Sequence, residues 1–172
     1  MRTKIKIVRL IPFFMLTISS CGYNFPGGRG LPEGVDRILV EVLKNRTSES
    51  GVENIATRNL INEFVLREER SLARSIDEAD AVLSGEVAKI SIQTIAAKGK
   101  DSASQRRVTV EVDLKLTKKD GSVVWVAKRL SDNQAYPVSN DKNETETAKR
   151  VAIDEASRRI AERALNRLIG DF

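Results

Sequence analysis

The segment from residue 105 to residue 118 alternates strictly between apolar and polar side chains. Its apolar positions are Val108, Val110, Val112, Leu114 and Leu116. Because successive side chains of a β-strand point to opposite faces of a sheet, this pattern predicts a strand with one buried face and one polar face. The rest of the chain must therefore supply an apolar layer for one side of a sheet, which limits the fold to layered architectures.

Two further strands are predicted on either side of this one. Asp120 and Gly121 form a typical two-residue hairpin turn, and a second strand-like segment follows at 122–136. Upstream, the segment 81–97 is also strand-like, but its apolar positions change from odd to even numbers near 88–89. A slip of one residue in a period of two predicts a β-bulge there. The three segments are expected to form an antiparallel meander.

Two segments have the spacing of amphipathic helices. In the first, predicted at 53–69, Ser50 and Glu53 fit a capping box ahead of the apolar positions. The second is predicted to begin near Asn143, with Glu146 three residues later. It carries mostly small apolar residues at every fourth position, namely Ala148, Ala152, Ala156, Ile160, Ala164 and Leu168. Such a face permits a close approach to a sheet.

A short apolar run at 37–44 predicts a buried first strand. The expected order is therefore β-α-β-β-β-α. Two helices are then available to cover the apolar face of the meander. We predict an α+β fold: a two-layer sandwich with a four-stranded mixed sheet and two helices on one face. A single domain is expected at 35–172, preceded at 21–34 by a tether that contains five Gly and two Pro.

The first twenty residues have the features of a secretory signal. Four cations within residues 1–9 precede an apolar run at 10–18, and Ser19 and Ser20 precede Cys21. The apolar run is shorter than the about 20 residues that a membrane-spanning helix needs. The residues before Cys21 resemble a bacterial lipobox, which implies a signal peptide at 1–20 and lipidation of Cys21. The alternative is a plain signal peptide with an incidental cysteine.

Composition argues against several classes of function. The net charge of +5 comes from 29 Lys and Arg against 24 Asp and Glu, but four of these cations lie in the predicted signal peptide. The remaining 25 cations and 24 acids give +1, so we expect no nucleic-acid partner. The chain has no His, and Cys21 is its one Cys. We therefore expect neither an enzyme nor a metal site or cofactor.

Three cations are candidates for contact with an anionic lipid. Arg106 and Arg107 begin the alternating strand, and Lys115 lies on its polar face. Guanidinium and ammonium groups bind phosphate well. The alternative is an ordinary charged sheet face, because Glu111 and Asp113 are interleaved with these cations.

The ordered motifs of the chain resemble a known family. Along the sequence these are Cys21-Gly22-Tyr23, Leu31-Pro32-x-Gly34-Val35, Asn45-Arg46-Thr47, Ala79-Asp80-Ala81-Val82-Leu83-x-Gly85 and an alanine-rich terminal helix. Together they are similar to the LptE family of lipopolysaccharide (LPS)-assembly lipoproteins, and the similarity covers essentially the whole chain after the signal peptide. Cys21 corresponds to the lipidation site of that family.

The resemblance implies a location and two partners. It implies a lipid-anchored protein on the periplasmic face of the outer membrane. It also implies a non-catalytic plug inside a large outer-membrane β-barrel similar to LptD, where the chain supports folding of the barrel and insertion of LPS. The alternatives are another outer-membrane lipoprotein that activates or adapts a cell-envelope enzyme, and a secreted enzyme of unfamiliar type.

Overall fold

The computed structural model of the chain describes residues 30–97 and 103–170. Its elements are β1 (Ile38–Val40), β2 (Lys44–Asn45), α1 (Val52–Glu68), the 3₁₀ helix η1 (Glu69–Ser71), β3 (Ala81–Ala97), β4 (Ala103–Lys118), β5 (Val123–Pro137) and α2 (Lys142–Gly170). The predicted signal peptide, Cys21 and most of the predicted tether lie outside the described residues.

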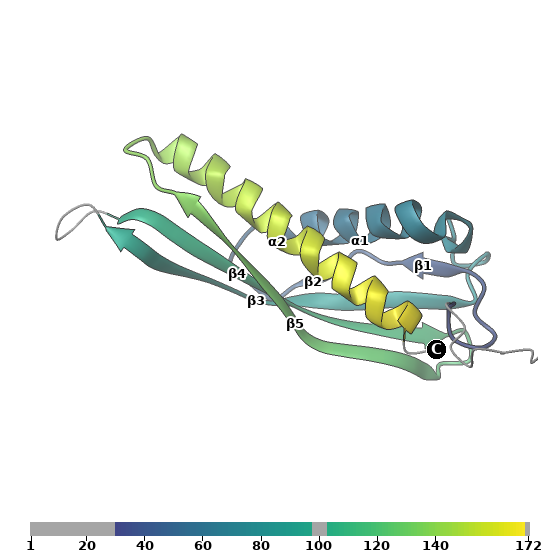
Figure 1. The fold of residues 1–172 in the computed structure, drawn as a ribbon. Helices are drawn as coiled ribbons and strands as arrows, with labels where there is room; N and C mark the ends of the chain where they lie inside the picture. Colours follow the sequence, from purple (N-terminus) through teal and green to yellow (C-terminus); the bar gives the residue numbers. More distant parts are fainter. Residues whose placement is uncertain (1–29, 98–102, 171–172) are drawn as a thin grey trace, which may run out of the picture.

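One mixed sheet and two helices make up the two layers. The strand order is β1-β3-β4-β5, and β2 pairs with β3 beyond the end of β1. Both β1 and β2 run parallel to β3, whereas β3, β4 and β5 form the antiparallel meander. Figure 1 shows α1 and α2 side by side on the same face of the sheet. The predicted α+β class is confirmed.

The first strand differs from its prediction, because the segment 37–44 forms two short strands rather than one. Between them, the backbone N–H of Leu43 donates to Thr57 Oγ1 of α1 at 3.0 Å, and the Leu43 side chain enters the core. The neighbouring Val42 is consequently turned outward, with 64% of its surface exposed. The sheet thus has five strands rather than the predicted four.

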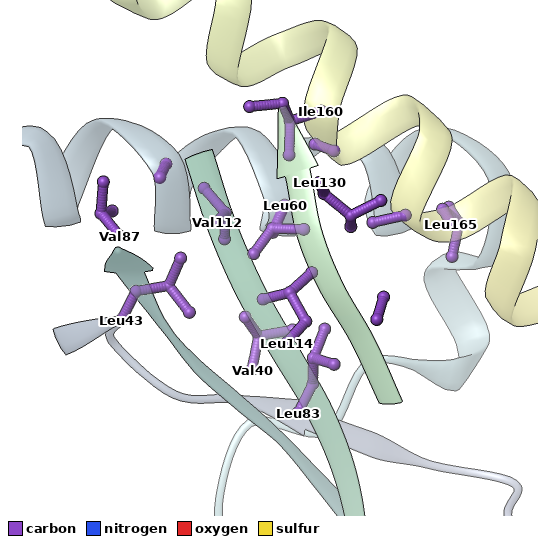
Figure 2. Packing of buried hydrophobic residues seen from close by; sticks show 14 of the residues in the cluster. Val40, Leu43, Leu60, Leu83, Val87, Val112, Leu114, Leu130, Ile160 and Leu165 are labelled. Carbon is purple, nitrogen blue, oxygen red and sulfur yellow. The ribbon is translucent and has the colours of Figure 1, made fainter. Parts of the chain in front are cut away.

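The core lies between the helices and β4. The five apolar side chains that define the predicted alternation of β4 are each at most 2% exposed, which confirms that prediction. The small residues of α2 are equally buried, since Ala152, Ala156 and Ala164 are at most 3% exposed. Figure 2 shows Ile160 and Leu165 of α2 on the same side of the sheet as Leu130. Small side chains on α2 let it lie close to the strands.

Both helices begin differently from the sequence prediction. Helix α1 starts after Gly51, whose φ is 80°, and the Glu53 carboxylate accepts a hydrogen bond from Asn45 Nδ2 at 2.8 Å. The Glu53 side chain therefore bonds to Asn45 of β2, rather than to the backbone of Ser50 as the predicted capping box requires. At α2 the cap is Asp141, whose Oδ1 accepts the N–H of Asn143 at 2.7 Å. An Asp side chain satisfies a first-turn N–H as well as the predicted Asn would.

Two bulges at the same level bend the sheet. On β3 the register skips Ala88, which confirms the predicted bulge. On β5, Lys128 and Arg129 together oppose Asp113 of β4. Arg129 has a φ of 53°, and its N–H donates to Asp113 Oδ1 at 2.6 Å, which stabilises this unusual conformation. Figure 1 shows β5 changing direction near its middle.

The bend divides the meander into two parts. We call the part formed by residues 81–87, 112–118 and 123–128 the tether half, because the described chain begins beside it. There, Lys118 Nζ donates to the carbonyl of Glu33 at 2.7 Å. The part formed by residues 89–97, 103–111 and 130–137 is the hairpin half. It ends at the connection between β3 and β4.

Candidate functional site

The face of the sheet that points away from the helices is hollowed in the tether half. A hollow of about 510 Å³ crosses the sheet from the linker between β1 and β2 to β5. Its apolar lining includes Val42, Val123 and Val126, which are 64%, 53% and 52% exposed. Three lysines also line it, namely Lys44, Lys115 and Lys128. Three acids line it as well, namely Glu41, Glu86 and Asp113, so the site combines an apolar surface with balanced charge.

The shape of the hollow depends on local backbone features. The break between β1 and β2 turns Val42 toward it, and the bulge at Lys128 and Arg129 bends β5 along its border. Gly85 adds no side chain to its lining. A Cβ at Gly85 would lie 2.1 Å from the carbonyl oxygen of Asp113, so no larger residue fits without a shift of the backbone. Glycine therefore allows β3 and β4 to approach closely here.

The carboxylates of the hollow are mostly engaged, whereas its lysines are not. Glu86 forms an ion pair with Arg46 at 2.9 Å, and one oxygen of Asp113 holds the bulge of β5. Glu41 is the remaining acid in the lining. Within the described ranges, none of the three lysine ammonium groups lies in an ion pair. The three carboxylates nevertheless keep their negative charge, so the lining carries no net charge.

The three cations predicted from the sequence do not form one cluster. Arg106 has the same parity on β4 as the buried Val108, whereas Arg107 lies on the opposite face of the sheet. Lys115 shares a face with Arg107, but the two lie eight positions apart on the strand, a distance of about 27 Å. Lys115 instead lines the same hollow as Lys44 and Lys128, which the sequence did not single out. Lys128 lies two residues after Val126, and the alternation of the strand places both on the same face. This spacing was the local sign in the sequence that Lys128 belongs to this face.

Arginines of α2 bind the backbone of β5 in the hairpin half. Arg159 Nε and Arg163 Nη2 contact the two oxygens of Asp132 at 2.9 and 2.8 Å. The same two side chains donate to the carbonyls of Asn133 and Ser131, each at 2.7 Å. Since β5 is the last strand of the sheet, these bonds cover carbonyl groups at an exposed edge. We assign these arginines a structural role.

Shifted pKa values occur outside the hollow. The backbone N–H groups of Arg37 and Asp36 lower the pKa of the Asp80 carboxyl by donating to it. Burial alone would lower the pKa of Lys149, but its hydrogen bonds to Glu146 and Glu49 raise it overall. Both groups fasten structural elements together. Across the described ranges, no His, Cys, Asp and Glu side chains gather into a group able to hold a metal ion.

Comparison with known proteins identifies the family. The sequence model of the lipopolysaccharide-assembly LptE family matches residues 35–168, so the chain belongs to this family. The family consists of non-catalytic outer-membrane lipoproteins associated with LPS transport. No curated protein matches the sequence. Neither helix of the described ranges has an apolar stretch that could cross a bilayer.

Solved structures share the fold. Lipoprotein B from Nitrosomonas europaea superposes with a TM-score of 0.55 at 8% identity, covering 83% of this chain and 86% of its own. The rare lipoprotein B from Shewanella oneidensis gives a TM-score of 0.50 at 11% identity, covering 76% and 92% of the two chains. At such identities the similarity establishes the architecture alone.

Proposed function

We propose that the chain is a lipid-anchored, non-catalytic component of LPS assembly that plugs a large outer-membrane β-barrel and contacts LPS. The observation that carries this proposal is the family match over residues 35–168. The structure supplies a compatible surface, because the helix-free face of β4 alternates Arg107, Thr109, Glu111, Asp113 and Lys115. A long polar face suits the polar interior of a wide barrel.

In this proposal the anchor is a lipid on Cys21. Only eight residues lie between Cys21 and Gly30, where the described chain begins, so this segment spans at most about 30 Å. An anchored chain would therefore hold its tether half near the membrane surface. Labelled palmitate should enter the wild-type protein but not the Cys21→Ala variant. Equal labelling of both proteins would exclude this cysteine as the lipidation site.

The barrel partner is tested by purification. We would isolate the tagged full-length lipoprotein from outer membranes in mild detergent and identify what accompanies it. The proposal expects a stoichiometric β-barrel of large mass whose gel mobility changes on heating. A lipoprotein that arrives alone, or with a periplasmic enzyme in place of a barrel, would contradict the plug role. The second of these results would favour the adaptor alternative.

The LPS contact is tested at the predicted cations. Arg106, Arg107 and Lys115 are each replaced by Gln, and Lys142→Gln at the start of α2 is the matched control. Loss of LPS binding in the three candidates, with binding retained in the control, would support the assignment. Equal binding by all four variants would contradict it and favour an ordinary charged sheet face.

A further inference from the structure

Part of one edge of the sheet has no partner strand. Strands β1 and β2 pair with the outer side of β3 as far as Val87, and β4 pairs with its other side as far as Ala97. In the described part of the chain, no strand pairs with the outer side of residues 89–97, which we call the open edge. Because a strand directs backbone N–H and C=O groups to both sides, the open edge can hydrogen-bond a further strand.

The other edges of the sheet are protected. Arg159 and Arg163 donate to backbone carbonyls of β5, and that strand carries a bulge and ends at Pro137. At β1, the segment after η1 lies along the edge, since the N–H of Ala73 donates to the Ile38 carbonyl at 2.9 Å. Charges, bulges, proline and covering segments are the usual protection against pairing with another chain. The open edge is therefore the exception in this sheet.

The sequence of the open edge suits the addition of a strand. Lys89 is its one charged residue, and it contains no Pro. Half of residues 90–97 are β-branched, namely Ile90, Ile92, Thr94 and Ile95. Two of the isoleucines are partly exposed, Ile92 at 42% and Ile95 at 38%. An exposed edge strand with an uncharged, β-branched sequence is a typical site of pairing between chains.

A second copy of the chain fits this edge. In antiparallel pairing with two-fold symmetry, the residue at the axis faces its own counterpart, and residues at equal distances on either side face each other. With Ile92 at the axis, Lys89 faces Ile95 of the second copy. The pairing then ends before Val87, where β2 already occupies the edge. It uses the part of β3 that keeps a regular register with β4, since residues 89–94 pair without a shift.

This arrangement brings apolar side chains together and keeps like charges apart. Ile90 and Ile92 pair with the buried Val110 and Val108 of β4, so they lie on the helix side of the sheet. Two copies would place four isoleucines side by side there. The two Lys89 residues would lie six positions apart along the strands, about 20 Å, which exceeds the screening length of about 8 Å in physiological salt.

We propose that two copies of the chain associate through the open edge, by antiparallel pairing of residues 89–95 about Ile92. A ladder of seven residues per copy is a small interface, so the association is weak in dilute solution. It is stronger where both copies are held at one membrane surface, because confinement raises their effective concentration. The inference goes beyond the proposed function, and the pairing does not rest on it, since the edge belongs to the folded domain.

Crosslinking tests the position of the axis. Ile92→Cys would be introduced into tagged and untagged full-length lipoprotein in the same cells, and the membranes would be treated with a short bismaleimide. We expect a tagged copy crosslinked to an untagged copy. Ala135→Cys, exposed on the protected edge strand β5, is the matched control and should give no such product. Cys21 is present in both variants, so any reaction of its own is the same in each.

Two results of this experiment would overturn the inference. The first is a yield of crosslinked copies at Ile92→Cys no higher than at Ala135→Cys, because it would indicate random collision or no contact. The second is a crosslink from Ile92→Cys to a different protein in place of a second copy, because the open edge would then receive a strand of another partner.

Charge variants test whether the two copies face each other directly. In this pairing, Ser91 faces Gln93 of the second copy on the helix-free side of the sheet. A variant with Ser91→Lys and Gln93→Lys opposes two pairs of lysines, so its self-association should weaken about tenfold. A variant with Ser91→Glu and Gln93→Glu should behave similarly, whereas a mixture of the two variants should associate at least as well as wild type. The readout is the amount of untagged copy that a tagged copy retains in mild detergent.

The mixture distinguishes direct pairing from damage to the fold. Ser91 and Gln93 lie on the solvent side of the strand, so both variants should fold, and thermal unfolding would verify this. If the mixture associates no better than the lysine variant alone, the two edges do not face each other and the inference is wrong. Unchanged self-association of the lysine variant would contradict it as well.

The same purification separates this inference from the proposed function. Tagged wild type that retains a β-barrel but no untagged copy would overturn the pairing and leave the plug role intact. Tagged wild type that retains an untagged copy but no barrel would support the pairing and contradict the plug role. Retention of neither would contradict both.

Discussion

The tether half and the hairpin half share three strands but differ in how β3 is covered. In the tether half, α1 and α2 lie over the sheet, and Leu83 and Val87 of β3 are 2% and 0% exposed. In the hairpin half, α2 covers β4 and β5, while Ile92 and Ile95 of β3 are 42% and 38% exposed. The same strand therefore passes from a buried core into an exposed arm.

The difference also concerns the edge of the sheet. Strands β1 and β2 pair with β3 only as far as Val87, and no described strand pairs with its outer side beyond that point. Soluble proteins usually guard such edges, as Arg159 and Arg163 do for β5. Stability is therefore concentrated in the tether half, whereas the part of β3 in the hairpin half is held mainly by its pairing with β4.

The largest expected effect compares apolar truncations in the two halves. Leu116 is fully buried in the tether half, and its replacement by Ala should lower the free energy of unfolding of the protein by about 2–5 kcal/mol. Ile92→Ala in the hairpin half should lose less than about 1 kcal/mol, since its side chain is already 42% exposed. Denaturant unfolding followed by fluorescence of Trp125 measures both. Similar losses would show that the two halves are equally well packed.

A second substitution tests the close contact of β3 with β4. Gly85→Ala would place a Cβ 2.1 Å from the Asp113 carbonyl oxygen, and the strands must separate to accept it. We expect a loss of about 1–3 kcal/mol in unfolding free energy, measured in the same way. Gly170→Ala is the control, because a Cβ there meets no atom within 4 Å. An unchanged free energy of unfolding in Gly85→Ala would mean that β3 and β4 can separate here at no cost.

Much of the layered fold could be predicted because its signals are local. The alternation of β4 and the slip of phase at Ala88 are both visible within one segment, and both are confirmed. The breaks in β1–β2 and in β5 could not be predicted. The first depends on the hydroxyl of Thr57 and the second on the carboxylate of Asp113, each supplied by another element. Arg129 adopts a positive φ without the glycine that usually marks one.

The lysine group of the hollow was missed for the same reason. Lys44, Lys115 and Lys128 lie on three different strands, and they line one hollow only because the sheet brings β2, β4 and β5 close together. Arg106 and Arg107 are adjacent in sequence, yet the alternation of a strand places them on opposite faces. The register and the bulges, rather than sequence proximity, decide which cations can act together.

The smallest expected effect concerns the hydrogen bonds of the Asp80 carboxylate in the tether half. Asp80 accepts the N–H groups of Asp36 and Arg37 at 3.1 and 2.9 Å, and these bonds lower its pKa below the usual 3.8. A carboxyl whose pKa is lower in the folded state than in the unfolded chain stabilises the fold. The stabilisation is complete at pH values above the pKa that the group has in the unfolded chain. This contribution is lost as the pH falls through the folded value.

Asp80→Asn should therefore have a lower urea midpoint than wild type at pH 7, and the two midpoints should converge as the pH falls below 3.8. Asp77→Asn is the matched control, because among the described residues the one hydrogen bond to Asp77 is accepted by its backbone carbonyl, from Lys119 Nζ. If the difference in urea midpoint between Asp80→Asn and wild type stays constant down to low pH, the effect comes from side-chain shape rather than charge. Convergence would show that an ionised carboxylate joins the start of β1 to β3, which adds a polar contribution to the greater stability of the tether half.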